Sequence, residues 1–153
     1  MDTKVKFNHQ STPGFAIART SHLLWSAFRS TLREVGWDIP PEETQAMIAL
    51  SDADGPLSMR EFAELMMRDA TTLKRQLDGL VERGFVRRVT SQQDGRVVMV
   101  SLTARGQDEL NAVLPVIEEL RRRVLAGISQ SDIEATLRTL HAMLRNLKLE
   151  RPS

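Results

Sequence analysis

The sequence predicts a mainly α-helical fold with one small β-hairpin, and three observations support that prediction. Apolar residues recur at helical spacing along most of the chain, with glycines where the periodic segments end. The spacing changes to that of strands only over Phe85–Thr90 and Val97–Leu102. The chain has 153 residues, of which 41% are apolar and 27% charged, so we expect one domain over 1–153 that buries its own core.

The first predicted helix runs from about Gly14 to Val35 and is apolar on two neighbouring faces. So wide an apolar band predicts burial on two sides, one against the domain core and one against something else. Gly36 is expected to end the helix. The two apolar rows are Ile17, Leu24, Phe28 and Val35, and Phe15, His22, Trp25 and Leu32.

The second predicted helix, Pro41–Leu50, has the start signals of a helix. Prolines suit the first helical position, and the acidic residues Glu42 and Glu43 interact favourably with the helix dipole in the first turn. Its inward side chains are expected to be Ala46, Met47 and Leu50. Residues 52–56 are rich in Asp, Gly and Pro and predict a loop.

Two short helices after this loop are separated by only a few residues. Ser58 and Glu61 fit a capping box that opens the first of them. Asp69 is a good N-cap for the second, and Gly84 is expected to end it. Such a closely joined pair predicts a helix-turn-helix. The expected core side chains are Phe62, Leu65 and Met66 from the first helix, and Leu73, Leu77, Leu80 and Val81 from the second.

The predicted hairpin follows the second short helix directly. Its β-branched strands flank the polar loop Ser91–Arg96, in which Asp94-Gly95 is a turn signal. A hairpin placed immediately after a helix-turn-helix is the arrangement called a winged helix. The sequence therefore predicts a winged helix-turn-helix lobe over residues 41–102.

Two long helices are predicted to follow the hairpin. Thr103 can cap the first, which reaches about Ala126 and contains Pro115 as the expected cause of a kink. Ser131 and Glu134 fit a second capping box. The last helix presents a narrow apolar seam, which is typical of a helix that packs on another helix. The apolar positions are Leu110, Val113, Leu114, Ile117, Leu120, Val124 and Leu125, and then Ile133, Leu137, Leu140, Leu144 and Leu147.

The stretch from Ser58 to Gln107 resembles the MarR family of bacterial transcriptional regulators. Three motifs support the resemblance, namely Leu80-Val-Glu-Arg-Gly-Phe-Val86, Asp94-Gly-Arg96 and Leu102-Thr-Ala-Arg-Gly106. The lengths and order of the flanking helices extend it over about residues 14–149. Two departures from the family pattern, Ala70 and the turn Met66-Met67-Arg68, bear on which DNA sequence is recognised.

The resemblance implies a homodimeric regulator that binds a pseudo-palindromic operator in double-stranded DNA, with repression as the default outcome. The helices over 14–36 and 103–149 would be long dimerisation helices flanking the winged helix-turn-helix. A two-fold dimer would hold two recognition helices about 34–36 Å apart, one turn of DNA. The alternative is a winged-helix module that binds protein or RNA, although a protein-binding face should expose apolar anchors.

The candidate DNA contacts begin on the helix that Asp69 caps. Arg75 could reach guanine O6 and N7, and threonines there could meet a thymine methyl group or a phosphate. The simpler interpretation is a solvated helix face, but the hairpin beside it favours DNA binding. The candidates on or near the side opposite the apolar row are Thr71, Thr72, Lys74 and Arg75.

The wing and the start of the first short helix complete the candidate interface. Arg96 suits a narrow minor groove, and the resemblance implies an ion pair between Arg96 and Asp94 that stabilises the wing. Ser58 and Arg60 could bind phosphate at a helix N-terminus. Neighbouring residues of a strand point to opposite faces, so the arginines at 87 and 88 cannot both face DNA. The remaining candidates are Arg88, Gln92 and Gln93.

Three residues of the first helix, His22, Trp25 and Arg29, lie on one face at spacings of three and four. The resemblance implies that a small aromatic or anionic ligand binds between the dimerisation helices and the DNA-binding lobe. An arginine beside aromatic rings would suit a carboxylate. We favour the simpler interpretation of a core tryptophan, an interface histidine and a surface arginine. Release by such an effector and control by protein level alone both stay open.

Composition and motifs exclude several other classes. The absence of cysteine excludes disulfides, thiol nucleophiles and thiolate metal sites. The three histidines lack metal-ligand spacing, and no phosphate loop, nucleophile elbow or acid–base pair indicates an enzyme. The net charge is only +1, but Ser58–Arg105 holds nine Lys or Arg against six Asp or Glu. We therefore expect a DNA partner with no cofactor, metal or catalysis.

The sequence also bears on location. No apolar run is long enough to cross a membrane, and Met1–Gln10 is polar and lacks the apolar centre of a signal peptide. We therefore expect a cytoplasmic protein without a membrane partner.

Overall fold

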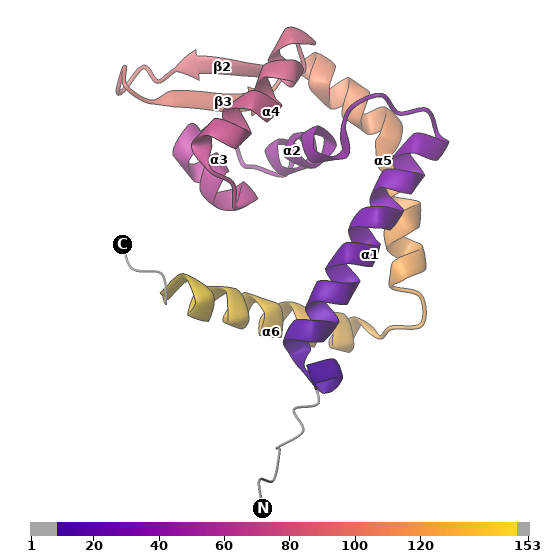
Figure 1. Ribbon diagram of the computed structural model, residues 1–153. Coiled ribbons are helices and arrows are strands. Elements are labelled where there is room, and N and C mark those ends of the chain that lie inside the picture. Colours follow the sequence, from indigo (N-terminus) through magenta and orange to yellow (C-terminus); the bar gives the residue numbers. More distant parts are fainter. Residues whose placement is uncertain (1–8, 150–153) are drawn as a thin grey trace, which may run out of the picture. The chain divides into compact units, whose positions relative to one another are not determined.

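The structure, a computed structural model, describes residues 9–149 and confirms the mainly helical fold with a small hairpin (Figure 1). The chain forms two compact units whose boundary lies within α5, the first ending at Leu120 and the second beginning at Arg121. Residues 1–8, most of the segment expected to lack an export signal, lie outside the described residues. The elements are η1 (His9–Ser11), α1 (Pro13–Glu34), α2 (Pro41–Ser51), β1 (Leu57–Ser58), α3 (Met59–Met66), α4 (Ala70–Glu82), β2 (Val86–Thr90), β3 (Val98–Leu102), α5 (Ala104–Val124) and α6 (Gln130–Leu149).

The sheet has three antiparallel strands in the order β1-β3-β2, one strand more than the sequence predicts. The predicted hairpin of β2 and β3 is confirmed, with Val86 opposite Leu102. The additional strand β1 places Leu57 opposite Val100 of β3. A strand of two residues shows no alternation of apolar and polar positions, so the sequence pattern could not reveal it.

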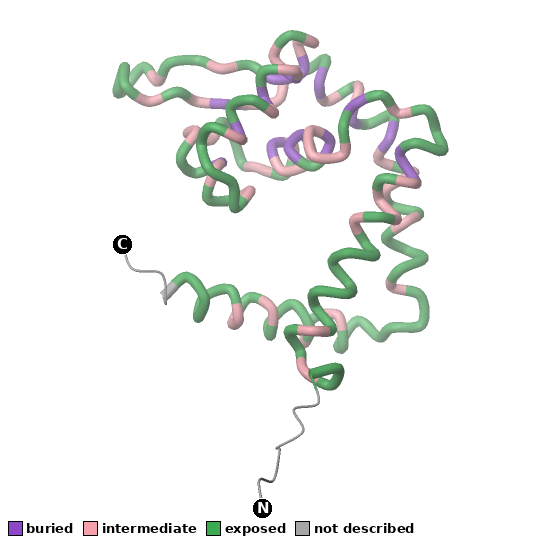
Figure 2. Tube along the Cα trace, in the orientation of Figure 1, coloured by how far each residue is buried: buried purple, intermediate pink, exposed green. Residues whose placement is uncertain are grey.

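The core of the first unit lies among α2, α3, α4 and the sheet, and the end of α1 and the first half of α5 pack against it (Figure 2). Leu65 of α3 is 57% exposed, against the prediction that it is buried. The inward face of α3 comprises Met59, Phe62, Ala63 and Met66, and Leu65 lies roughly 110° of helix rotation from the middle of that face. Met66 and Val81 are only partly buried. Three of the four core residues predicted for α4 are fully buried, namely Leu73, Leu77 and Leu80.

Glycines end α1 and α4 in the same way, as predicted. Gly36 and Gly84 adopt the left-handed conformation, with φ of 68° and 75°. After α4, the N–H of Gly84 donates to the carbonyl of Val81, and the N–H of Phe85 donates to that of Leu80. These bonds satisfy carbonyls at the end of the helix, and the positive φ explains why glycine occupies the position.

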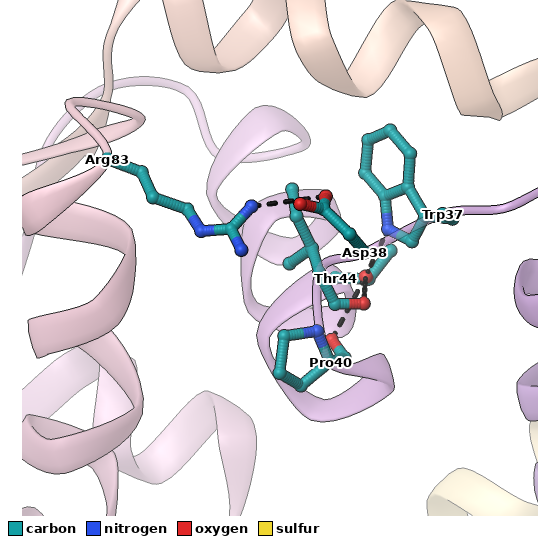
Figure 3. Close-up of polar contacts among 6 residues, drawn as sticks. Trp37, Asp38, Pro40, Thr44 and Arg83 are labelled. Atoms are coloured by element: carbon teal, nitrogen blue, oxygen red, sulfur yellow. Dashed lines mark hydrogen bonds and ion pairs between the residues drawn. The ribbon is translucent and has the colours of Figure 1, made fainter.

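The segment between α1 and α2 is tied to both α2 and the end of α4 (Figure 3). Trp37 Nε1 donates to the hydroxyl of Thr44 at 2.8 Å, and that hydroxyl donates to the carbonyl of Pro40 at 3.0 Å. Arg83, which follows α4, pairs with Asp38 at 3.1 Å. An exposed pair of this kind contributes only ~0–1 kcal/mol, so the buried Thr44 contacts matter more for the position of α2.

Thr103 caps α5, as predicted, and joins the helix to the sheet. Its hydroxyl accepts the N–H of Gly106 at 3.0 Å and donates to the carbonyl of Gly84 at 2.6 Å. Its own N–H donates to the carbonyl of Phe85 at 2.9 Å. Pro115 lies inside α5 as expected, and it lacks the N–H that a helix would use there.

The second unit contains α6, whose cap differs from the prediction. Ser129 caps the helix instead of Ser131, because its hydroxyl accepts the N–H of Asp132 at 3.2 Å. Both serines stand three residues before an acidic residue, so the spacing alone could not separate them. None of residues 130–148 is buried. The exposed residues of the predicted seam are Leu137, Leu144 and Leu147.

The turn between α3 and α4 contains Met67, the one non-glycine residue with positive φ in the described chain. The left-handed conformation costs an L residue ~1–2 kcal/mol, and a β-branched residue suffers most. We expect Met67→Gly to raise the free energy of unfolding by roughly 0.5 kcal/mol and Met67→Val to lower it by about 1 kcal/mol, measured by urea denaturation. If the valine variant were the more stable of the two, the left-handed conformation of Met67 would be wrong.

Candidate nucleic-acid interface

The first turn of α4 is fixed by its N-cap. Asp69 Oδ1 accepts the N–H of Thr72 at 2.9 Å, and Oδ2 accepts the Thr72 hydroxyl at 2.7 Å. These hydrogen bonds lower the pKa of Asp69. Thr72 is half-buried with its hydroxyl occupied, whereas the sequence predicts it on the exposed side.

The other candidates on α4 form an exposed row. Thr71, Lys74 and Arg75 are exposed, and they lie on the side of α4 away from its buried leucines. Within the described residues, no hydrogen bond or ion pair occupies the guanidinium of Arg75. One face of α4 is fully buried, and the opposite face carries cationic side chains. The exposed face therefore suits docking on an anionic partner.

The wing loop between β2 and β3 is closed by its own backbone. The N–H of Ser91 donates to the carbonyl of Val97 at 2.8 Å, and the N–H of Val97 donates to the carbonyl of Asp94 at 3.0 Å. Asp94 Oδ1 accepts the backbone N–H of Arg96 at 3.0 Å. The expected ion pair is thus replaced by a hydrogen bond to the backbone, which leaves the guanidinium of Arg96 without a partner among the described residues. Gln92 and Gln93 are also exposed at this tip.

Ser58 and Arg60, the predicted phosphate contacts, both have partners in the protein. The Ser58 hydroxyl accepts the N–H of Glu61 at 3.2 Å, and the Ser58 N–H donates to Glu61 Oε2 at 2.8 Å. The capping box is therefore confirmed, and these bonds lower the pKa of Glu61. Arg60 is exposed and pairs with Glu64 at 3.3 Å, a surface contact that phosphate could replace at little cost.

Arg88 differs from the other candidates because α4 holds its guanidinium. One nitrogen, Nη1, lies 2.7 Å from Oδ1 of Asp78, and the other, Nη2, donates to the carbonyl of Lys74 at 2.9 Å. Arg88 lies opposite the buried Val100 in the sheet, so it faces the core side and α4. The sequence offers no signal for this contact, since the partners are ten and fourteen residues away across a turn.

The predicted ligand residues lie along α1 as the spacing requires. His22 and Arg29 are exposed, and Trp25 is half-buried with its ring centroid 5.6 Å from that of Phe28. Their role in ligand binding stays a prediction. Within residues 9–149, no three His, Cys, Asp or Glu residues are grouped so that they could hold a metal ion.

Comparison with known proteins agrees with this geometry. A model of the MarR family matches residues 37–97, the stretch that contains α2, the helix-turn-helix, β2 and the wing loop up to the start of β3. Within the described chain, no helix has the length and apolar character needed to cross a membrane.

Three similar proteins cover nearly the whole chain. The curated relative "HTH-type transcriptional repressor IacR" of Pseudomonas putida is 22% identical over 94% of this chain and 84% of its own length. The crystal structure of a "probable transcriptional regulator" from Pseudomonas aeruginosa is 30% identical, covers 88% of this chain and 98% of its own, and has a TM-score of 0.69. A MarR family regulator from Silicibacter pomeroyi is 26% identical, with 91% and 92% covered and a TM-score of 0.75.

Proposed function

Because this chain belongs to the MarR family of transcriptional regulators, and not to a family of enzymes, we propose that it binds double-stranded DNA as a homodimer at a pseudo-palindromic operator. The observation that supports the proposal best is the exposed row of α4. Thr71, Lys74 and Arg75 face outward from a helix whose other side is sealed into the core. In a winged helix this helix enters the major groove, where its N-terminal half meets base edges.

Each of the DNA-facing residues would make a different kind of contact with the duplex. Arg75 would donate two hydrogen bonds to a guanine, and Thr71 would contact a thymine methyl group or a phosphate. Arg96, whose guanidinium is free at the tip of the wing, would enter a narrow minor groove. Lys74, Arg60 and the helix start at Ser58 would contact phosphates, with Gln92 and Gln93 beside Arg96. These contacts would set affinity and salt dependence more than sequence choice.

The homodimer is supported by apolar surface that one chain leaves uncovered. Leu23 of α1 and Leu147 of α6 are each 60% exposed, and they belong to helices with few buried residues. Large exposed apolar patches mark interfaces in soluble proteins. We infer that α1, the end of α5 and α6 pair with the same helices of a second chain, with α6 contributing its leucine seam.

A charge in this seam should separate the subunits. Leu144 is 39% exposed in the single chain, so Leu144→Glu can fold, but the dimer would bury the carboxylate in an apolar seam. We expect light scattering to give the mass of one chain for Leu144→Glu, and of two chains for the wild type. Arg138→Glu, on the other side of the same helix, is the matched control and should stay dimeric. A dimeric Leu144→Glu variant would place the interface elsewhere.

Repression, with release by a small molecule, is the regulatory form that we propose. A bound dimer near a promoter would block polymerase. A small aromatic or anionic ligand near His22, Trp25 and Arg29 would release it by binding better to a form with a different spacing of the two DNA-binding lobes. Such a ligand shifts the equilibrium only by its differential affinity, typically ~1–3 kcal/mol.

Binding to matched nucleic acids tests the choice of partner. The purified protein is titrated with a duplex DNA pool, the same sequences as single-stranded DNA, and duplex RNA at ~150 mM salt, where binding through phosphates alone is weakened. We expect the duplex DNA pool to bind tightest. Preference for RNA, or binding to none of the three by a folded dimer, would favour an RNA- or protein-binding module instead.

A further inference from the structure

Arg88 connects the strand that leads into the wing with α4, the helix proposed to enter the major groove. It lies in β2, the strand that leads into the wing loop, and it contacts both Asp78 and the backbone of Lys74 in α4. Its side chain is only 21% exposed, and that of Asp78 is 50% exposed. The guanidinium is therefore partly shielded from solvent and salt, whereas the Asp78 carboxylate at the other end of the pair is exposed.

The geometry of this contact requires arginine. The two guanidinium nitrogens reach two acceptors one helical turn apart, a carboxylate and a main-chain carbonyl. Lysine offers a single ammonium centre on a flexible stem and cannot span both acceptors in a fixed plane. Within the described structure, Nε of Arg88 is buried without a hydrogen-bond partner, so the two Nη atoms make all of its polar contacts.

The two ends of the contact belong to the two elements proposed to bind DNA. Lys74 is adjacent to Arg75 on α4, and Arg88 is four residues before Gln92 at the wing loop. A rigid link between them would preset the distance from the major-groove helix to the minor-groove arginine. Binding elements that are already ordered lose less entropy on association and so bind more tightly.

We propose that Arg88 is a positioning residue, which holds α4 and the wing in their DNA-binding arrangement and contacts no phosphate itself. The proposal rests on the proposed DNA-binding function of α4 and the wing. It replaces the expectation from the sequence that Arg88 contacts DNA directly.

Removal of Asp78 distinguishes a positioning role of Arg88 from a phosphate-binding role, because the two roles predict opposite changes in DNA affinity. Asp78→Ala deletes a negative charge near the DNA and frees the guanidinium, so a phosphate-binding Arg88 would bind DNA equally well or more tightly. A positioning Arg88 loses its anchor, and we expect the affinity for the selected operator to fall about 10-fold. Glu82→Ala, which removes the same charge from the same helix without touching Arg88, is the control and should not weaken binding. Unchanged or tighter binding by Asp78→Ala would overturn the proposal.

Substitution of Arg88 itself provides a second measurement. Arg88→Lys keeps the charge, so a phosphate contact would largely survive it, whereas we expect it to weaken operator binding nearly as much as Arg88→Gln. Loss of one phosphate contact would also change the slope of log K against log salt by ~0.9. We expect the slope to stay that of the wild type in both variants. A smaller slope for Arg88→Gln, with binding kept by Arg88→Lys, would show a direct phosphate contact.

A readout without DNA distinguishes failure of this proposal from failure of the proposed function. Hydrogen exchange at the wing amides of Ser91 and Val97, which donate within the loop, is measured in the free protein. We expect exchange to accelerate several-fold in Asp78→Ala and Arg88→Lys but not in Glu82→Ala. If the wild type bound no duplex DNA but this pattern appeared, the link would stand and the DNA-binding function would fall. Equal exchange in all variants would overturn the link.

Discussion

Gly106→Ala is expected to destabilise the protein by about 3 kcal/mol or more. A Cβ at Gly106 would lie 2.1 Å from the carbonyl oxygen of Phe85 and 2.8 Å from its carbon. These are main-chain atoms, and the same carbonyl accepts the N–H of Thr103, so it cannot move without displacing the start of the hairpin from α5. Overpacking against fixed atoms commonly lowers the free energy of unfolding by ~1–3 kcal/mol. A contact this short is expected to cost the upper value of that range or more.

Urea denaturation of Gly106→Ala and of a matched variant measures this effect. Gly14→Ala is the control, because Gly14 also lies in a helix but a Cβ there meets nothing within 4 Å. The control should be unchanged or more stable by up to ~1 kcal/mol, since alanine favours helix. If the free energy of unfolding of Gly106→Ala lay within about 0.5 kcal/mol of that of the wild type, the close approach of α5 to Phe85 would be wrong.

Arg75→Ala is expected to remove the largest single share of sequence discrimination. Loss of two hydrogen bonds to a guanine should weaken operator binding by ~1–3 kcal/mol, roughly 5- to 150-fold, with little change on unrelated DNA. Competition of operator and scrambled duplexes for each variant measures the ratio. Lys74→Ala is the matched comparison, because a phosphate contact should be lost about equally on both duplexes. If Arg75→Ala lost the same affinity for both duplexes, Arg75 would contact phosphates instead of a base.

The features that sequence alone predicts are those with local causes. The capping box at Ser58, the Asp69 cap and the stops at Gly36 and Gly84 depend on residues a few positions apart, and all of them are confirmed. The fully buried row of α4, which begins at Leu73, follows from helical spacing in the same way. These features together predict the helix-turn-helix, and the β-branched runs on either side of Asp94-Gly95 predict the hairpin that follows it.

The features that the sequence misses depend on the fold around them. Leu65 stands three residues after Phe62, which is the spacing of a core row, but the buried face of α3 extends toward Ala63 and Met66, away from Leu65. Asp94 and Arg96 have opposite charges, yet a backbone N–H two residues away is the nearer donor in a tight loop. The partners of Arg88 are set by how β2 crosses α4, and no periodicity in the chain contains that information.

Selection from a randomised pool of duplex DNA tests the central claim most directly. The purified protein is incubated with the pool at ~150 mM salt, and the bound fraction is sequenced after several rounds. We predict an inverted repeat whose half-sites are centred one helical turn apart, ~10–10.5 base pairs, because a two-fold dimer presents two copies of α4. A folded dimer that enriched no sequence, or a single unrepeated half-site, would contradict a homodimer reading its operator through α4.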